Sequence, residues 1–337
     1  MSNNIQFDKP FKTYEEQLSI LESRNIQIDN RDFAIKVLGS LSYYTIINGY
    51  KNTFLSVKGT DNFVKGTNFE DLYTLHTIDV NINNIILKYI LYVERYLKTR
   101  ISYIISKQYG VYTDPSDLTN QNSNDYLYRG YYSRSSPGRN NILRSIKETL
   151  SSDRINESVA HYCNTKNHIP PWILVTNLTF GLVIKWYSIL SSADKSQLCS
   201  EFLPFSSLVD ADKKEFLSVS LQLLRKYRNM IAHANRTFAI SNLPVLPKNQ
   251  LLFLSYGILS EQEYDFGIGK SDLFAVILVC FILIDDKYIL TNFLNDLHYI
   301  LGPYQSVKMN DKSILEIFRL PDNIFERLEH LLIEKFN

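Results

Sequence analysis

The stretch FEDLYTLHTIDVNINNIILKYILYVERYLKTRISYIISKQ (69–108) repeats its apolar residues every three or four positions. An α-helix has about 3.6 residues per turn, so this spacing places them on one side of a helix. The members of that face are Leu72, Leu75, Ile78, Ile82, Ile85, Ile86, Tyr89, Ile90, Val93, Leu97, Ile101, Ile104 and Ile105. The stretch predicts two helices or one bent helix, ended by Gly110.

The rest of the chain also has mostly helical spacing. TYEE (13–16) is a capping-box pattern, and the sequence IPPW (169–172) predicts a rigid helix start with a buried tryptophan. Further helices are predicted for 31–38, 142–150, 155–162 and 216–236. The segment 111–141, rich in Ser, Asn, Asp, Gly and Pro, predicts a long loop.

Strand patterns are nearly absent, and only NLPVLPKNQLLFLSYG (242–257) has extended character. No repeat is evident, and no linker divides the chain into halves. The sequence therefore predicts an all-α fold. We expect residues 1–65 to form an N-terminal helical extension and residues 66–337 to form the main helical domain.

Composition excludes several classes of protein. The 337 residues carry 36 basic and 35 acidic side chains, so nucleic-acid binding would have to come from a local patch. The run LFAVILVCFILI (273–284) is too short to span a bilayer and predicts a buried helix. The three cysteines form no metal-binding pair, and no glycine-rich phosphate loop is present. We expect a cytoplasmic protein with no membrane partner, metal or cofactor.

The segment RKYRNMIAHANR (225–236) is the most distinctive part of the sequence. On a helical wheel, Arg225, Arg228, Asn229, His233 and Arg236 fall on one side. The apolar members on the opposite side are Leu223, Leu224, Tyr227, Met230, Ile231 and Ala234. The polar stripe contains neither lysine nor acid, although a solvated helix usually mixes both charges. It predicts either a basic surface face or an anion site.

The residue types of this stripe fit phosphodiester chemistry. Arginine binds phosphate with two N–H groups, and histidine transfers protons near neutral pH. Asn229 precedes His233 by one turn and can orient its imidazole. One histidine cannot easily act as both acid and base, so we expect a two-fold homodimer that brings two copies together.

RNMIAH (228–233) resembles the R-x4-H signature of HEPN domains, and longer blocks resemble the AbiD/AbiF-type abortive-infection family. Those blocks are KPFKTYEEQLSILESRNIQI (9–28), LSYYTIINGYKNTF (41–54), FEDLYTLHTIDVNI (69–82), VERYLKTRISYIISKQYG (93–110) and IPPWILVTNLTFGLVIKWY (169–187). The resemblance implies a HEPN-like helical bundle with additional C-terminal helices and a role in phage defence. It also implies a metal-independent RNase acting as a homodimer, in some relatives neutralised by a structured antitoxin RNA.

The resemblance also assigns residues. It makes Arg228 and His233 the catalytic pair, with Asn229 as the orienting neighbour. Glu94 matches an acidic position that supports the site. The chain departs from the family at two positions: Lys98 stands where arginine is more common, and Asn177 stands where relatives often carry glutamate. Lys98 remains a candidate RNA contact and Asn177 a candidate supporting residue.

The loop within 111–141 and the start of the next helix interleave rings with cations. The rings are Tyr126, Tyr128, Tyr131 and Tyr132, and the cations are Arg129, Arg134, Arg139 and Arg144. This pattern predicts either an RNA-contacting surface or a disordered loop. The candidate RNA contacts are Arg225, Arg236, Lys98, Arg129, Tyr131, Arg134 and Arg139. We therefore expect an endoribonuclease. The alternatives are a non-catalytic RNA-binding module and a helical adaptor for an acidic protein.

Overall fold

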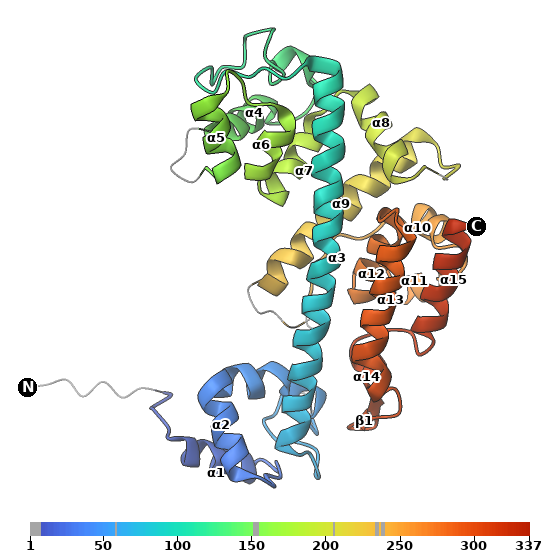
Figure 1. Ribbon diagram of the computed structural model, residues 1–337. Coiled ribbons are helices and arrows are strands. Elements are labelled where there is room, and N and C mark those ends of the chain that lie inside the picture. Colours follow the sequence, from blue (N-terminus) through green and yellow to red (C-terminus); the bar gives the residue numbers. More distant parts are fainter. Residues whose placement is uncertain (1–7, 58, 151–154, 205, 233–235, 237–239) are drawn as a thin grey trace, which may run out of the picture. The chain divides into compact units, whose positions relative to one another are not determined.

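The computed structural model of the chain describes residues 8–57, 59–150, 155–204, 206–232, 236 and 240–337. Helices form nearly all of the regular structure in these residues (Figure 1). The one sheet among them is an antiparallel hairpin of β1 (Lys308–Met309) and β2 (Lys312–Ser313). Asn310 and Asp311 close the hairpin with positive φ angles of 50° and 62°, as a type I′ turn requires. The predicted all-α fold is confirmed.

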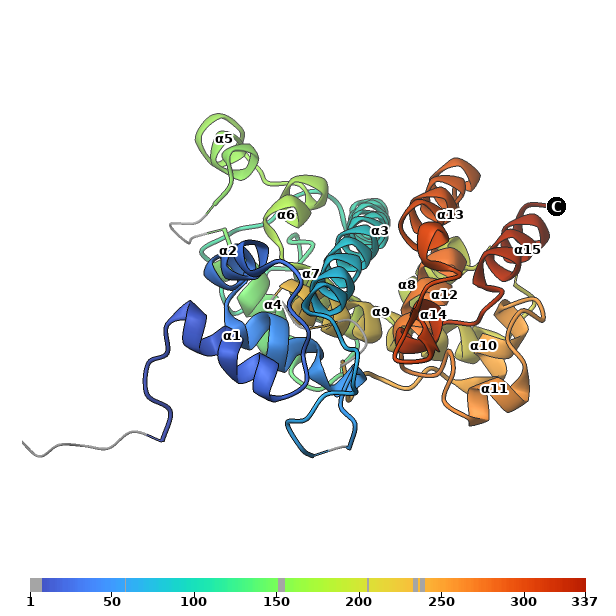
Figure 2. The ribbon, with the colours of Figure 1, turned by 90° about the horizontal axis from the view of Figure 1, so that it is seen from below.

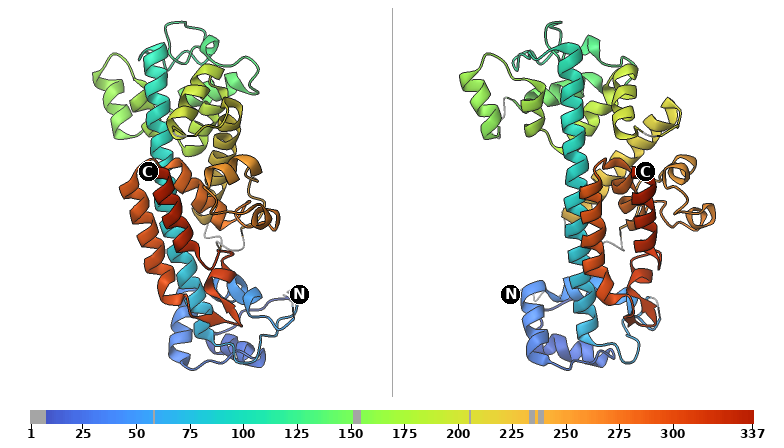
Figure 3. Two further views of the ribbon diagram at one scale, coloured as in Figure 1. Left: turned by 90° about the vertical axis from the view of Figure 1, so that its right-hand side faces the viewer. Right: turned by 45° about the vertical axis from the view of Figure 1, so that its right-hand side comes forward.

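The long apolar stretch forms a single helix, α3 (Phe69–Tyr109), of 41 residues (Figures 1 and 3). Its predicted apolar face is largely buried, and Leu72, Ile90 and Ile101 are each 0% exposed. Gly110 follows with a φ of 82°, a left-handed conformation that glycine adopts without a Cβ clash. One helix is therefore present, and the alternative of two helices is wrong.

The described residues form two compact units. One contains the described residues of 1–84, Arg236, and Asp296–Asp322. The other contains the described residues of 85–235 and 239–295, together with Asn323–Asn337. The predicted boundary at residue 65 stays a prediction.

The first unit begins with two short helices, α1 (Tyr14–Ser23) and α2 (Arg31–Leu41). They pack side by side (Figure 2) and bury Leu18, Leu21, Ala34, Val37 and Leu38. The capping box is confirmed, because the Glu16 N–H donates to the Thr13 hydroxyl and the Thr13 N–H donates to the Glu16 carboxylate. The unit also contains η1 (Tyr44–Asn48), η2 (Lys51–Thr53), η5 (Gly302–Tyr304), α14 (Ile314–Ile317) and the hairpin.

The second unit contains most of the remaining helices. They are α4 (Arg139–Glu148), α5 (Glu157–Thr165), α6 (Pro171–Asn177), α7 (Phe180–Ile189), α8 (Ser192–Phe202), α9 (Asp210–Ala232), α10 (Lys248–Leu254), α11 (Glu261–Asp265), α12 (Leu273–Leu283) and α15 (Ile324–Phe336). Helix α13 (Lys287–Leu301) belongs to this unit up to Asn295 and to the first unit beyond it. Helix α9 packs against α7, α8, α10 and α12 and lies at the core of the unit.

Helix α12 is apolar on every side, and all of its residues are buried. This confirms the prediction of a buried helix at 273–284, because a helix without a polar face is stable in water only when it is covered. Among the described residues, no helix combines the length and apolar character that crossing a bilayer requires.

Two local predictions are wrong. The segment 242–257 was expected to be extended. Residues 242–247 are not helical, but the expectation is wrong for Lys248–Leu254, which form α10, because KNQLLFL contains good helix formers and no β-branched residue. Trp172 was expected to be buried and is 48% exposed. Helix α6 does start with Pro171 as predicted, but its buried face is Pro171, Leu174 and Val175, so Trp172 points away from it.

Candidate functional site

Helix α9 carries the arginine-rich segment that the sequence predicts to be functional. Its inner face is formed by Leu223, Leu224 and Tyr227, each 0% exposed. Asn229 is exposed and Arg228 is half-buried. Because apolar and polar side chains separate with helical spacing, the helix has the two faces that the sequence predicts at these positions. Arg228 and Asn229 are therefore accessible to solvent.

The catalytic histidine of the prediction, His233, lies outside the described residues. Its role as proton donor and acceptor stays a prediction, and so does its orientation by Asn229. In the described part of the signature, the Arg228 Nη1 group donates to the Asn229 Oδ1 atom over 3.3 Å. A guanidinium has five N–H groups, so this single hydrogen bond does not exhaust its capacity to bind an anion.

Arg225 lies one turn before Arg228 and is half-buried. It packs against Gly181 in the first turn of α7, where a Cβ atom would lie 3.4 Å from the Arg225 Cδ atom. The Arg225 Nε atom is buried and has no hydrogen-bond partner among the described residues. Arg225 was predicted to lie on the polar side of the helix, but its Nε atom is buried.

Gly181 was not among the residues predicted to matter. The available signal was a glycine inside a predicted helix, in the sequence TFG (179–181). Glycine weakens a helix, so its presence there suggests a close packing contact. Sequence alone could not identify Arg225 as the partner, because the two residues are far apart along the chain.

Arg236 does not continue the stripe, because it is not part of a helix. It belongs to the first compact unit. Its Nη1 group donates to the Asn48 carbonyl over 3.0 Å and to the Gly49 carbonyl. Asn48 is the last residue of η1 and Gly49 follows it directly. The predicted position of Arg236 on the polar face of α9 is wrong.

Glu94 and Lys98 form an ion pair one turn apart on α3, with 2.9 Å between the Lys98 Nζ and Glu94 Oε1 atoms. Glu94 is 8% exposed, so its carboxylate is mostly shielded from solvent. Its Oε2 atom is buried and has no hydrogen-bond partner among the described residues. A buried carboxylate oxygen is costly to leave unsatisfied, so this atom is a ready acceptor for a further proton donor.

Asn177 joins the end of α6 to two neighbouring segments. Its Nδ2 group donates to the Thr149 carbonyl over 2.8 Å, and its Oδ1 atom accepts from the Asn156 N–H over 2.9 Å. Asn156 in turn caps α5. A glutamate could not make both hydrogen bonds, because its carboxylate has no N–H. The amide therefore has a structural function here, and its supporting role in catalysis stays a prediction.

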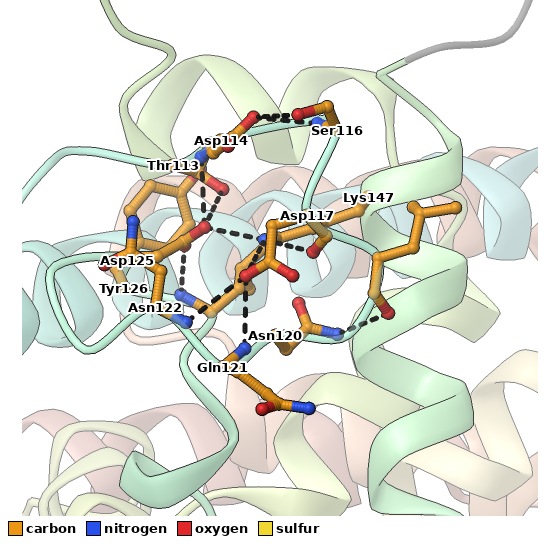
Figure 4. Close-up of polar contacts among 12 residues, drawn as sticks. Thr113, Asp114, Ser116, Asp117, Asn120, Gln121, Asn122, Asp125, Tyr126 and Lys147 are labelled. Carbon is orange, nitrogen blue, oxygen red and sulfur yellow. Dashed lines mark hydrogen bonds and ion pairs between the residues drawn. The ribbon is translucent and has the colours of Figure 1, made fainter.

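The predicted loop between α3 and α4 is built around a buried ion pair (Figure 4). The Lys147 Nζ atom lies 2.7 Å from the Asp125 Oδ2 atom, and both side chains are 0% exposed. The Asp125 carboxylate also accepts hydrogen bonds from the Thr113 hydroxyl and from the N–H groups of Asp114 and Leu127. The carboxylate is thus fully engaged, as a buried charge requires.

Asp117 organises the neighbouring turn (Figure 4). Its carbonyl accepts from the Lys147 ammonium over 2.7 Å, and its carboxylate accepts from the Thr119 hydroxyl and from the N–H groups of Gln121 and Asn122. Chiefly because of the Thr119 hydrogen bond, the pKa of Asp117 is lowered to about 2. These hydrogen bonds order the loop, so the interpretation of a disordered segment is wrong.

Two of the four loop tyrosines are core residues. Tyr126 is 0% and Tyr132 is 2% exposed. The Tyr126 hydroxyl donates to the Ile169 carbonyl, and the Tyr132 hydroxyl donates to the Tyr126 carbonyl, both over 2.9 Å. The Trp186 indole N–H donates to the Tyr132 hydroxyl over 3.1 Å. The prediction that these two rings stack on RNA is wrong, because the fold covers them.

Tyr131 is half-buried, and its ring stacks on that of Tyr109 with 4.4 Å between centroids. The edge of the Tyr128 ring meets it at 5.1 Å. One face of Tyr131 is thus occupied by protein. Its predicted contact with RNA stays a prediction.

The arginines of this region lie at the surface. Arg129 and Arg134 are exposed, and Arg139 is half-buried at the start of α4. An open hollow of about 350 Å³ is lined by Arg134, Ser136, Gly138, Arg139, Asn140 and Asn141. No acidic residue occurs in the sequence between Asp125 and Glu148. The surface is therefore locally basic although the whole chain is nearly neutral.

A family model described as Abi-like protein matches residues 36–239. The chain belongs to this family. The match spans Glu94, the arginine loop and the segment 225–236, and thus every residue predicted from the sequence to take part in the site. A comparison with curated proteins and one with solved structures gave no match. Membership in the Abi-like family supports a role in abortive infection. Within the described part of this Abi-like protein, no three His, Cys, Asp or Glu side chains group so as to hold a metal ion.

Proposed function

We propose that this Abi-like protein is a metal-independent endoribonuclease that acts in defence against phage. The family supports the defence role. The observation that carries the activity is the accessible end of α9, where Arg228 and Asn229 lie on the solvent side. In the sequence, His233 follows Arg228 by five positions. A guanidinium, an amide and an imidazole at this spacing are suited to RNA cleavage by the RNA's own 2′-hydroxyl.

In the proposed reaction, His233 accepts the proton of the ribose 2′-hydroxyl as its oxygen attacks the adjacent phosphorus. The bond from phosphorus to the 5′ oxygen breaks, and an imidazolium donates a proton to that leaving oxygen. The products are a 2′,3′-cyclic phosphate and a 5′-hydroxyl. Arg228 stabilises the negative charge that builds on the phosphate oxygens. Asn229 orients the imidazole through its side-chain amide.

The second proton-transfer group comes, in this proposal, from a second copy of the chain. A two-fold axis through the α9 faces would pair two His233 side chains and two sets of arginines. Sedimentation at working concentration is expected to show a dimer. A strict monomer that still cuts RNA would contradict the shared site.

The proposed reaction is tested most directly with purified protein and mixed cellular RNA in excess EDTA. We expect fragments that end in a cyclic phosphate, because no step requires a metal. Complete loss of cutting in EDTA, with recovery on adding a divalent metal, would contradict the mechanism.

Arg225 is proposed to bind a substrate phosphate, and its side chain can lie where it does because Gly181 has no Cβ atom. Substitution Gly181→Val is expected to displace Arg225, because added methyl groups would occupy the space of its Cδ and Nη1 atoms. RNA affinity should fall about as much as in Arg225→Ala, on the order of tenfold for a charge-assisted hydrogen bond. The double variant should be little weaker than either single variant, since both changes disrupt the same interaction with RNA. Fluorescence anisotropy with 2′-O-methyl RNA measures the affinities, and additive effects would argue against the link.

The arginine hollow is proposed to hold the RNA backbone, with Arg129, Lys98 and Tyr131 as further contacts. Substitution Arg134→Ala or Arg139→Ala should weaken binding at low salt. The slope of log affinity against log salt should become shallower by about 0.7–0.9 for each phosphate that the variant no longer neutralises. The matched control is Arg31→Ala, because Arg31 is exposed but already paired with Glu15 and Glu22. An unchanged salt slope in both hollow variants would remove this surface from the RNA path.

A non-catalytic RNA-binding module is the second candidate, and the same hollow favours it. The buried Lys147–Asp125 ion pair orders the loop that leads to this hollow, and the loop residues do not belong to α9, so the protein could bind a structured small RNA there without cutting it. Salt-dependent RNA binding combined with intact RNA after long incubation would favour this candidate over the endoribonuclease.

A further inference from the structure

The first compact unit contains an open hollow of about 570 Å³ that none of the roles above uses. It is formed where the early turns of α3 meet the end of α13 and the turn η5 that follows. The side chains that line it include Asn81, His298, Tyr299 and Tyr304. The volume falls in the range of roughly 300–1,000 Å³ that small-molecule sites occupy.

Aromatic rings form much of the wall of this hollow. Tyr299 is 80% exposed, and Tyr304 is half-buried. His298 lies in the last turn of α13, and its imidazole packs directly over Gly302. A Cβ atom at Gly302 would lie 3.2 Å from the His298 Nδ1 atom, so the glycine gives the imidazole its place. The rings are thus presented by a helix end and a tight turn rather than by a free loop.

The lining of the hollow is uncharged, which favours a neutral ligand over a charged one. None of the described residues that line the hollow is Lys, Arg, Asp or Glu. A phosphate or a zwitterionic amino acid would find no opposite charge there, whereas a neutral flat ring loses little solvation on entering. Asn81 contributes an amide, which has both donor and acceptor atoms. Rings for stacking and an amide for the edge are the means by which proteins bind nucleobases.

We propose that this hollow binds a nucleobase, stacked on the tyrosine rings and hydrogen-bonded at its edge by Asn81. Adenine suits the site best, because an asparagine amide can pair with its N6 and N7 atoms together. The base belongs either to a free nucleoside or to an unpaired position of an RNA strand. Base binding at this hollow does not require that the protein cut RNA.

The experiment measures binding of adenosine, uridine and a short 2′-O-methyl oligoadenylate to the full chain by calorimetry. The oligonucleotide lacks the attacking hydroxyl, so the result is independent of the proposed cleavage. Binding of adenosine indicates a nucleoside site, and binding of the oligonucleotide alone indicates an RNA base site. Either result supports the proposal when Tyr299→Ala weakens it about tenfold, the effect expected when a base no longer stacks on an aromatic ring.

Three further variants sharpen the test. Asn81→Leu should reduce the preference for adenosine over uridine, and Gly302→Ala should weaken binding by displacing the imidazole. Tyr288→Ala is the matched control, because Tyr288 lies on the same helix and is 75% exposed but does not line the hollow. Both tyrosines are so exposed that neither change should shift the unfolding temperature. The proposal is overturned if the wild-type chain binds neither probe, or if Tyr288→Ala weakens binding as much as Tyr299→Ala.

Discussion

Substitution Lys147→Met is expected to lower the free energy of unfolding by about 3–5 kcal/mol. Lys147 and Asp125 are both fully buried, and the methionine would leave the Asp125 carboxylate without its counter-charge. The same change removes the donor to the Asp117 carbonyl, so two turns of the loop lose their common partner. Urea denaturation followed by circular dichroism gives the magnitude. The variant should also bind RNA more weakly, because the arginines are carried by this loop.

Two comparison variants separate burial from simple charge removal. Lys12→Met breaks the Lys12–Glu16 pair, whose side chains are 43% and 48% exposed, and should change stability by less than about 1 kcal/mol. Adding Asp125→Asn to Lys147→Met removes the unpaired charge and should restore part of the stability, because the amide oxygen can still accept hydrogen bonds. A cost below about 1 kcal/mol for Lys147→Met alone would show that the pair does not hold the loop.

This ion pair also shows what a sequence leaves undetermined. Asp125 lies in a segment without periodicity, and Lys147 follows in a predicted helix. Nothing in their separation indicates that they meet. The composition of the segment correctly predicted a loop. Its ordered conformation, however, depends on interactions between residues that meet only in the folded chain. Tyr126 and Tyr132 are buried for the same reason, which composition could not reveal.

Periodicity predicted the elements that follow one simple rule. Helix α3 has one apolar face and α12 has no polar face, so hydrophobic spacing was enough for both. Predictions failed where the position of a side chain depends on contacts that the helical repeat does not show. The wheel extended the helix to Arg236, although Arg236 is not helical. It also treated Arg225 as solvated, although Arg225 packs against Gly181.

The sequence thus predicts which residue types form the candidate site better than it predicts which other residues they contact. The polar face of α9 is confirmed at Arg228 and Asn229. The helical repeat alone places them on a different side from the buried Leu224 and Tyr227, so the sequence was sufficient to predict it. Partners from other elements, such as Gly181 for Arg225, depend on the packing of α7 against α9. Substitutions on the polar face of α9 therefore test the proposed chemistry, whereas substitutions at partners such as Gly181 test how that chemistry is positioned.

Substitution His233→Ala is expected to reduce RNA cleavage by about 10²–10⁴-fold, the usual contribution of a positioned acid or base. RNA affinity should stay within about twofold, because the arginines of α9 and of the loop remain. Single-turnover cleavage of an end-labelled RNA separates the chemical step from binding. Arg228→Lys should also slow cleavage strongly, since a lysine keeps the charge but not the two parallel N–H groups.

His330→Ala provides the matched control, because His330 is an exposed histidine that lies near Glu334 on the same helix. Its cleavage rate should equal that of the wild-type chain. Cutting that survives His233→Ala unchanged would remove the imidazole from the mechanism and leave α9 as an RNA-binding face.

Mixed dimers of His233→Ala and wild-type chains test the shared site. If each cleavage event needs both imidazoles, one mutant copy should inactivate the whole dimer, whereas independent sites would keep half of the activity.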